Sequence, residues 1–124
     1  MQYIGKIDLK KIGIYAQKIT NDILILTDER KLHIYQEHKK DYNVIMKNLI
    51  RIALNPSEVL EDNKNKDTIL LIGEVNKNNM VIVVKLKTTN IIEHPNNSIM
   101  TAWIIRDKNL KKLREKNKII YKSE

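Results

Sequence analysis

The sequence contains no cysteine, two prolines and three glycines. Without cysteine the chain forms no disulfide and no thiolate metal site, and a reducing compartment is its natural location. Because glycine and proline are scarce and no repeat or low-complexity tract is present, no segment has the composition of a linker. We therefore expect a single domain over residues 1–124, long enough to bury one core.

Long hydrophobic runs are also missing. At the N-terminus, Lys6 and Asp8 interrupt the apolar residues before the core of a signal peptide could form. No run elsewhere has the length that is needed to span a bilayer. We expect a soluble, cytoplasmic protein without a membrane partner.

Positive charge is what the chain has in excess. Its 23 Lys and Arg residues outnumber 15 Asp and Glu residues, which makes the formal charge +8. Such a field attracts polyanions and speeds encounters with nucleic acid. The alternative is charge that merely keeps the protein soluble, since Lys, Asn and Ile are abundant together, as in proteins from AT-rich genomes.

The charge is concentrated near the C-terminus. Between Arg106 and Lys122 stand eight Lys and Arg residues and two acidic residues. We expect the lysines and arginines of this cluster, among them Lys111, Lys112 and Arg114, to contact nucleic-acid phosphates. Contacts of this kind provide affinity without choosing a base sequence.

Hydrophobic periodicity predicts both strands and helices. Six segments rich in branched residues are predicted strands: residues 3–7, 22–26, 68–75, 80–87, 98–105 and 118–122. Asn76-Lys77-Asn78-Asn79 predicts a hairpin turn between the third and fourth of them. In the segment 80–87, alternation places Met80 and every second residue on one apolar face, and Val81, Val83, Lys85 and Lys87 on the other.

Three helices are predicted, over residues 28–38, from Asp41 to the stop at Asn55-Pro56, and over residues 107–115. Thr27 and Asp28 are the candidate N-caps of the first helix. Residues 9–20 fit neither period, and the polar segments 57–67 and 88–97 are expected to be loops. The order of the elements predicts an α+β fold, with helices packed on one face of an antiparallel sheet.

Short segments spread along the chain, taken together in their order, resemble a known family of domains. They are Ile-Gly-Lys-Ile-Asp at 4–8, Thr-Asp-Glu-Arg at 27–30, His-Ile at 33–34, His38, Asp-Tyr at 41–42, Asn-Pro at 55–56, Lys-Leu-Lys-Thr at 85–88, Asn-Ser-Ile at 97–99, Thr101, and Lys-Ile-Ile-Tyr-Lys at 118–122. This set resembles the phage-encoded nuclease-like domains of the barnase, EndoU, colicin and RelE (BECR) superfamily.

The resemblance covers nearly the whole chain, although no single motif is specific. It implies N-terminal helices packed on a four-stranded, or larger, antiparallel sheet. It also implies metal-independent cleavage of RNA in phage, toxin or inter-microbial conflict settings. Relatives have His-Pro ahead of the Asp-Tyr pair, whereas Lys39 and Lys40 stand here between His38 and Asp41, which changes how the second helix is seated.

Metal-free cleavage of RNA needs a base for the 2′-hydroxyl, an acid for the 5′-leaving oxygen, and positive donors around the phosphorus. Histidine suits both proton transfers. His33 is the first candidate, because Arg30 and Glu37 share its helix face and the carboxylate can orient the imidazole. The alternative for His33 is a half-buried histidine bonded to a backbone carbonyl.

His38 is the second candidate. It lies about 140° around an ideal helix from His33, so the two act together only if the helix ends or bends near His38. The alternative for His38 is stabilisation of the helix C-terminus. His94 is expected to be a solvated loop residue.

Strand residues complete the predicted site. Lys85 and Lys87 project together and could hold a phosphate, or could protect the strand from edge pairing. Ser98, a candidate for substrate binding, and Thr101, a candidate catalytic residue, fall on opposite faces by strict alternation, so they reach one site only if a bulge intervenes.

Trp103 and Tyr121 have two readings each, and Arg51 has one. Trp103, expected on the same face as Thr101, either stacks on a base or belongs to the core. Tyr121 either donates to a phosphate or covers the sheet edge. Arg51 is expected to be solvated.

The sequence thus predicts a metal-independent endoribonuclease of phage or mobile-element origin. No metal and no cofactor are expected, and the partner is nucleic acid, RNA rather than DNA. A cognate antitoxin or immunity protein is a possible further partner. The alternative is a module with the same fold that binds nucleic acid, or serves as a phage structural accessory, without catalysis.

Overall fold

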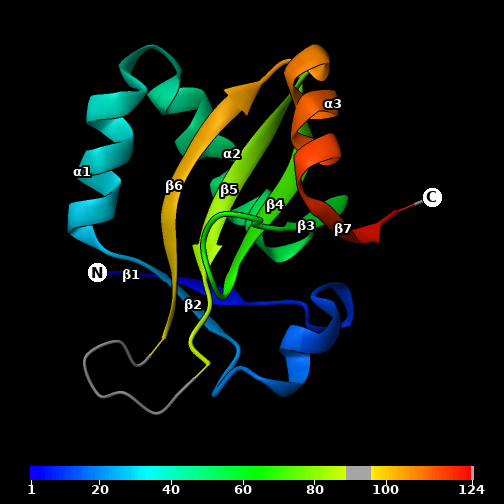
Figure 1. Ribbon diagram of the computed structural model, residues 1–124. Coiled ribbons are helices and arrows are strands. Elements are labelled where there is room, and N and C mark those ends of the chain that lie inside the picture. The colour runs from blue at the N-terminus through cyan, green and yellow to red at the C-terminus, as the bar shows by residue number, and fades with distance from the viewer. Residues whose placement is uncertain (89–95, 124) are drawn as a thin grey trace.

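The computed structural model describes residues 1–88 and 96–123, and within them the chain forms a seven-stranded sheet with three α-helices (Figure 1). In spatial order the strands are β1 (Gln2–Lys6), β2 (Ile23–Leu26), β6 (Asn97–Ile105), β5 (Asn78–Lys85), β4 (Thr68–Val75), β3 (Glu58–Glu61) and β7 (Lys118–Lys122). The helices are α1 (Asp28–Glu37), α2 (Tyr42–Leu54) and α3 (Asp107–Lys116). None of the helices described is long and apolar enough to cross a membrane.

The predicted helices and the hairpin are confirmed. Thr27 is the N-cap of α1, and its hydroxyl accepts a hydrogen bond from the backbone N–H of Arg30 at 3.2 Å. Strands β4 and β5 pair over their full lengths, and the turn between them narrows to Asn76 and Lys77. Asn76 adopts a φ of 54°, which asparagine tolerates better than most residues. Residues 9–20, which fitted no period, form two 3-10 helices, η1 (Leu9–Lys11) and η2 (Gly13–Gln17).

The prediction of a loop over residues 57–67 is wrong for its first part. Residues 58–61 form β3, which pairs with β4 on one side and with β7 on the other. The acidic composition suggested a loop, but Glu58 is buried because Arg114 of α3 binds it through two hydrogen bonds of 2.8 Å. These hydrogen bonds raise the pKa of the Arg114 guanidinium. A long-range ion pair therefore allows an acidic residue in an inner strand.

The sheet is mixed, so the prediction of an antiparallel sheet is wrong at one pair of strands. Strands β2 and β6 run parallel, through Leu24 opposite Asn97 and Ile25 opposite Ser98. Asn97 is completely buried at this junction. Its side-chain amide accepts from the N–H of Lys87 at 2.8 Å and donates to the carbonyls of Asn21 and Ile23 at 2.8 and 2.9 Å.

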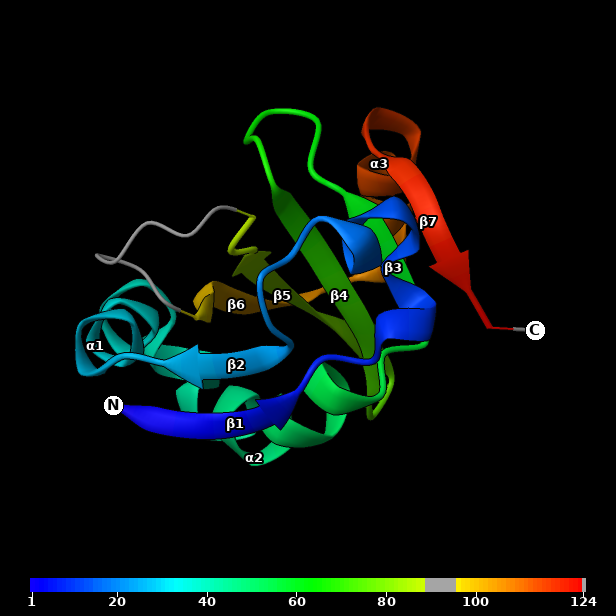
Figure 2. The same ribbon diagram turned by 90° about the horizontal axis from the view of Figure 1, so that it is seen from below.

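Helices cover both faces of the sheet, and the expectation of one covered face is therefore wrong. Figure 2 shows α2 and α3 on opposite sides of the strands. The larger core contains apolar residues of α1 and α2 and the alternate residues Met80, Ile82 and Val84 of β5. In β4, Gly73 permits the close approach of α2, because a Cβ there would lie 2.7 Å from Ile52. The predicted apolar face of β5 is confirmed by this core.

A smaller core lies on the other face, beneath α3. It is built from Leu110 of α3 with Leu60, Leu70, Ile72, Val81 and Ile105 of the strands. Its partly buried members include Val83 and Trp103, so Trp103 packs against the core. Helix α3 covers only one end of this face, and the other end, near the start of β6, holds the candidate site.

Strand β6 contains a β-bulge that changes which side chains reach this second face. Val83 of β5 pairs with Thr101, but the next residue, Val84, pairs with Ile99. Met100 is therefore the extra residue of the bulge. Because of this shift, Ile99 faces the larger core while Thr101 faces the smaller one.

The ion pair between Arg114 and Glu58 generates a stability prediction. Arg114→Ala leaves the buried carboxylate without its partner, and we expect the free energy of unfolding to fall by roughly 2 kcal/mol. This is less than for a fully buried pair, because the Arg114 side chain is 33% exposed. Urea denaturation followed by circular dichroism measures the change. Lys112→Ala, on the outer side of the same helix, is the matched control with an expected change below about 0.5 kcal/mol; equal losses in the two variants would contradict the prediction.

The buried amide of Asn97 generates a second prediction. Asn97→Ala removes the acceptor of the Lys87 N–H and the donor to the carbonyls of Asn21 and Ile23, and the loss of hydrogen bonds to buried groups carries a desolvation penalty. We expect a loss of about 3 kcal/mol in the same denaturation experiment. Asn96→Ala, at the neighbouring position, serves as the control. A loss below about 1 kcal/mol for Asn97→Ala would show that β2 is held to β6 by other contacts.

Candidate functional site

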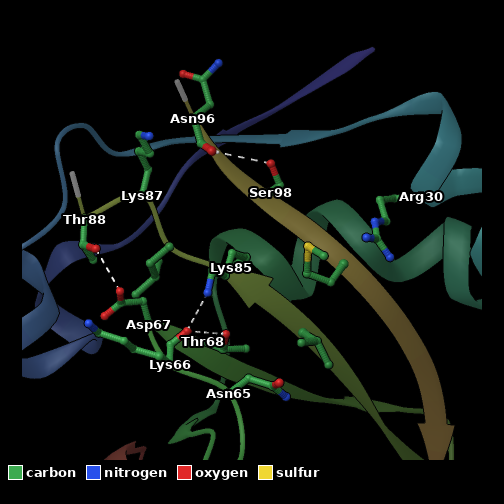
Figure 3. A pocket seen from close by; sticks show the side chains of 13 residues that line it. Arg30, Asn65, Lys66, Asp67, Thr68, Lys85, Lys87, Thr88, Asn96 and Ser98 are labelled. Carbon is green, nitrogen blue, oxygen red and sulfur yellow. Dashed lines mark hydrogen bonds between the residues drawn. The ribbon is translucent and has the colours of Figure 1, made fainter. Parts of the chain in front are cut away.

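A pocket of about 670 Å³ lies on the part of the second sheet face that α3 leaves open. Its floor is formed by Val83 of β5 together with Leu86 and Met100. Its rim is polar and comes from three parts of the chain: the start of α1, residues 65–68 before and at the start of β4, and the ends of β5 and β6 (Figure 3). An apolar floor with a polar rim is typical of a ligand site.

Four cationic side chains are among the described residues that line this pocket. They are Arg30, Lys66, Lys85 and Lys87. Asp67 is the one carboxylate in the same described lining. Figure 3 shows Arg30 on α1 across the pocket from Lys85, so the positive charge comes from both walls. An anion between the two walls would be attracted from two directions.

Arg30 reaches the pocket because of where α1 begins. The Thr27 cap starts the helix directly after β2, and α1 then runs beside β6 (Figure 1). Ile34, one turn beyond Arg30, is completely buried in the larger core. Arg30 and Ile34 are four residues apart on α1, so they share one side of the helix, and Arg30 lies in the lining of the pocket.

Lys85 is held from the opposite wall. Its Nζ donates a hydrogen bond to the backbone carbonyl of Lys66 at 2.8 Å (Figure 3). A carbonyl carries no net charge, so it positions the ammonium without neutralising it. An ammonium has three N–H donors, which leaves donors of Lys85 for a bound anion. Lys87 lines the same wall but is only 7% exposed.

The bulge in β6 brings Ser98 and Thr101 to one face, which corrects the expectation of opposite faces. Ser98 pairs with Lys85 and Thr101 with Val83, and these two residues of β5 share the second sheet face. Ser98 lines the pocket, and its hydroxyl makes a long contact of 3.5 Å to the carbonyl of Asn96. Thr101 is not in the pocket lining, and its Oγ1 is buried without a hydrogen-bond partner among the described atoms.

The described histidines do not line the pocket. His33 is half-buried in α1, one turn beyond Arg30, and its predicted partner Glu37 is exposed. His38 caps the C-terminus of α1, since the helix ends at Glu37. His33 and His38 could act together only if the helix ended or bent near His38, and α1 does end there. His94 lies outside the described residues.

The remaining predicted site residues lie away from the pocket. Tyr121 packs against the larger core, and the Nζ of Lys11 lies 5.0 Å from its ring centroid. Lys111 and Lys112 are exposed on α3, whereas the neighbouring Arg114 points to Glu58 and is occupied. Arg51, which was expected to be solvated, is exposed but also donates to the carbonyl of Glu74 at 3.0 Å.

Sequence reasoning missed one wall of the pocket. Lys66, Asp67 and Thr68 line it, and the sequence predicted only a polar loop that ends at Asp67 and a strand that begins at Thr68. The available signal was an Asn-Lys-Asp run directly before a strong strand, because such residues accept tight turns. No cluster of three His, Asp or Glu side chains that could hold a metal ion occurs in residues 1–88 and 96–123.

Comparisons with known proteins place the chain in a family. A family model described as "phage-Barnase-EndoU-ColicinE5/D-RelE like nuclease2" (PBECR2) matches residues 1–122. The comparisons with curated proteins and with solved structures gave no match. The family match spans every element from β1 to β7, including α1, β4, β5 and β6, which contribute residues to the pocket. The chain therefore belongs to the PBECR2 family of phage-type BECR nucleases.

Proposed function

We propose that this protein is an endoribonuclease that cleaves RNA without a metal ion, with the scissile phosphate bound between Arg30 and Lys85. The observation that supports the proposal is the pocket on the open sheet face, with cationic side chains on both walls. A phosphodiester carries one negative charge, and the transition state for its cleavage concentrates more charge on the oxygens around phosphorus. Fixed cations in a concave site stabilise that charge.

The reaction that fits this site is internal transfer. The 2′-oxygen loses its proton and attacks phosphorus, the bond from phosphorus to the 5′-oxygen breaks, and that oxygen gains a proton. The products are a 2′,3′-cyclic phosphate and a free 5′-hydroxyl. The nucleophile belongs to RNA, so the same reaction is impossible on DNA. Arg30 and Lys85 would contact the phosphate oxygens, and Ser98 would donate a further hydrogen bond.

His33 is the proposed acid and base at the α1 wall. It lies one helical turn beyond Arg30 and is half-buried, so a nucleotide next to the bound phosphate would pass near it. His38 lies beyond the end of α1 and is the second candidate. Exposed lysines of α3, Lys111 and Lys112 among them, would contact flanking phosphates on the same side of the sheet.

A second function is favoured by one observation. Neither described histidine lines the pocket, and an acid or base must come within hydrogen-bond reach of the proton that it moves. A module that binds nucleic acid through the same cations, without cleaving it, needs no such group. The two functions therefore differ in what happens to the RNA after it binds.

Cleavage of a mixed tRNA and mRNA pool in EDTA tests the proposed function. We expect the wild-type protein to cut RNA and to leave cyclic phosphate ends, and a substrate with a 2′-deoxy sugar at the cut site to remain intact. Arg30→Ala and Lys85→Met should each lower the rate by about 100-fold, because each removes a donor to the transition state. His33→Ala should lower it by about 100-fold or more.

The controls for this experiment lie on the same helix. Lys31→Ala, next to Arg30 but outside the pocket, should change the rate by less than about threefold, and His38→Ala should reduce it less than His33→Ala does. Each variant is first shown to be folded by circular dichroism. If the wild-type protein leaves every RNA intact yet binds it in a salt-dependent way, the binding module replaces the nuclease.

The lysines of α3 generate a prediction about affinity. If Lys111 and Lys112 contact phosphates, replacing both with alanine should weaken RNA binding and make the slope of log affinity against log salt shallower by about 1.4, or 0.7 for each contact to a single strand. Fluorescence anisotropy at several salt concentrations measures the slope. Lys47→Ala on α2, which covers the opposite face of the sheet, is the control. An unchanged slope for the double variant would exclude α3 from the RNA-binding surface.

A further inference from the structure

We propose that Asp67 is a positioning residue, which holds the Lys66 carbonyl against the Lys85 ammonium and so sets the cationic wall of the pocket. The inference rests on the proposed function, because Asp67 would position Lys85, the residue that is proposed to bind the scissile phosphate. Asp67 belongs to the segment 62–67 between β3 and β4, which closes one side of the pocket.

The backbone of Asp67 makes an unusual turn. Its φ is 53°, in the left-handed region that aspartate, asparagine and glycine adopt more readily than other residues. The Asp67 carbonyl accepts a hydrogen bond from the N–H of Leu86 at 2.8 Å. The turn therefore docks the segment on the chain just beyond Lys85.

The turn at Asp67 also determines the direction of the preceding carbonyl. The carbonyl of Lys66 accepts from Lys85 Nζ at 2.8 Å and from the Thr68 hydroxyl at 3.0 Å. Both donors come from strands that start or end at the pocket. A different φ at Asp67 would rotate this carbonyl away from Lys85, and the ammonium would lose the contact that fixes its place.

The side chain of Asp67 fastens the same turn. Its Oδ2 accepts a hydrogen bond from the Thr88 hydroxyl at 2.9 Å (Figure 3). The carboxylate thus ties the segment to the chain on the far side of Lys85 and Lys87. Asp67 therefore binds the segment 85–88 twice, through its backbone carbonyl at Leu86 and through its carboxylate at Thr88.

The negative charge of Asp67 rules against a role in attracting a phosphate. A carboxylate in the lining of a phosphate pocket repels the ligand, so its presence has to be explained by something other than attraction. Asp67 also has a second neighbour: burial raises the pKa of Tyr15, and the nearby charges of Glu61 and Asp67 raise it further. The residue therefore lies at a junction between η2, the segment 62–67 and the pocket, where a positioning role fits.

A series of substitutions at Asp67 separates the backbone from the side chain. Asparagine keeps the tolerance for positive φ and an acceptor for Thr88, glycine keeps only the backbone freedom, and alanine keeps neither. We expect affinity for a fluorescent RNA oligonucleotide to fall about tenfold in Asp67→Ala and by an intermediate factor in Asp67→Gly. Asp67→Asn should recover the affinity that alanine loses. Asn63→Ala, in the same segment but outside the pocket lining, is the matched control and should bind as the wild type does.

A double-mutant cycle distinguishes positioning from general loss of structure. If Asp67 acts through Lys85, then Asp67→Ala should reduce affinity less than twofold in a protein that already contains Lys85→Met. A tenfold loss in that background too would show that Asp67 supports the fold rather than Lys85, and would overturn the proposal.

A second readout does not depend on RNA. Reductive methylation followed by peptide mass spectrometry measures how accessible each lysine amine is. We expect Lys85 to react several-fold faster in Asp67→Ala than in the wild type, while Lys77 in the β4–β5 turn reacts equally in both. Equal rates for Lys85 would overturn the proposal even if RNA binds. Failure of the wild-type protein to bind RNA, with faster labelling of Lys85 in the variant, would instead contradict the proposed function and leave the positioning role supported.

Discussion

The buried amide of Asn97 is the interaction on which the arrangement of the sheet depends. It joins β2, the start of β6 and the chain that leaves β5, through three hydrogen bonds to backbone groups. Among the described residues, the β1–β2 ribbon pairs with the rest of the sheet through β6, at Leu24 opposite Asn97 and Ile25 opposite Ser98. A buried polar side chain is costly unless every group is satisfied, and here satisfaction requires all three segments to meet at once. One of these three groups is the N–H of Lys87, so the same amide also holds the pocket wall that contains Lys85 and Lys87.

The site results from incomplete coverage of one sheet face. Helix α2 packs on the larger core, while α3 covers only part of the opposite face. The uncovered part has an apolar floor and a basic rim, since α1 contributes Arg30 from one side and the segment 62–67 contributes Lys66 from the other. The bulge at Met100 then directs Ser98 and Thr101 to this face.

Electrostatics explains why cations with different surroundings serve different purposes. The guanidinium of Arg114 is bound by a buried carboxylate and stabilises β3. The ammonium of Lys85 is bound by the carbonyl of Lys66, which carries no net charge and does not neutralise it. Lys111 and Lys112 are exposed on α3, where they add to a surface field that screening by salt weakens. Composition alone assigns these four residues the same charge, and only their partners distinguish them.

The local pattern of the sequence determined the helices, the β4–β5 hairpin, the apolar face of β5 and, with the ordered short segments, the family. These features depend on neighbours within a few residues, which capping, alternation and turn chemistry describe. The tertiary structure alone decided that Glu58–Glu61 is a strand, that β2 and β6 are parallel, and that a bulge brings Ser98 and Thr101 to one face. It also placed Arg30 and Lys85, but neither described histidine, in the lining of the pocket. The physical reason is that an ion pair between residues 58 and 114, or an amide shared by residues 21, 87 and 97, joins positions far apart in the chain, and such partners are not visible in any local window.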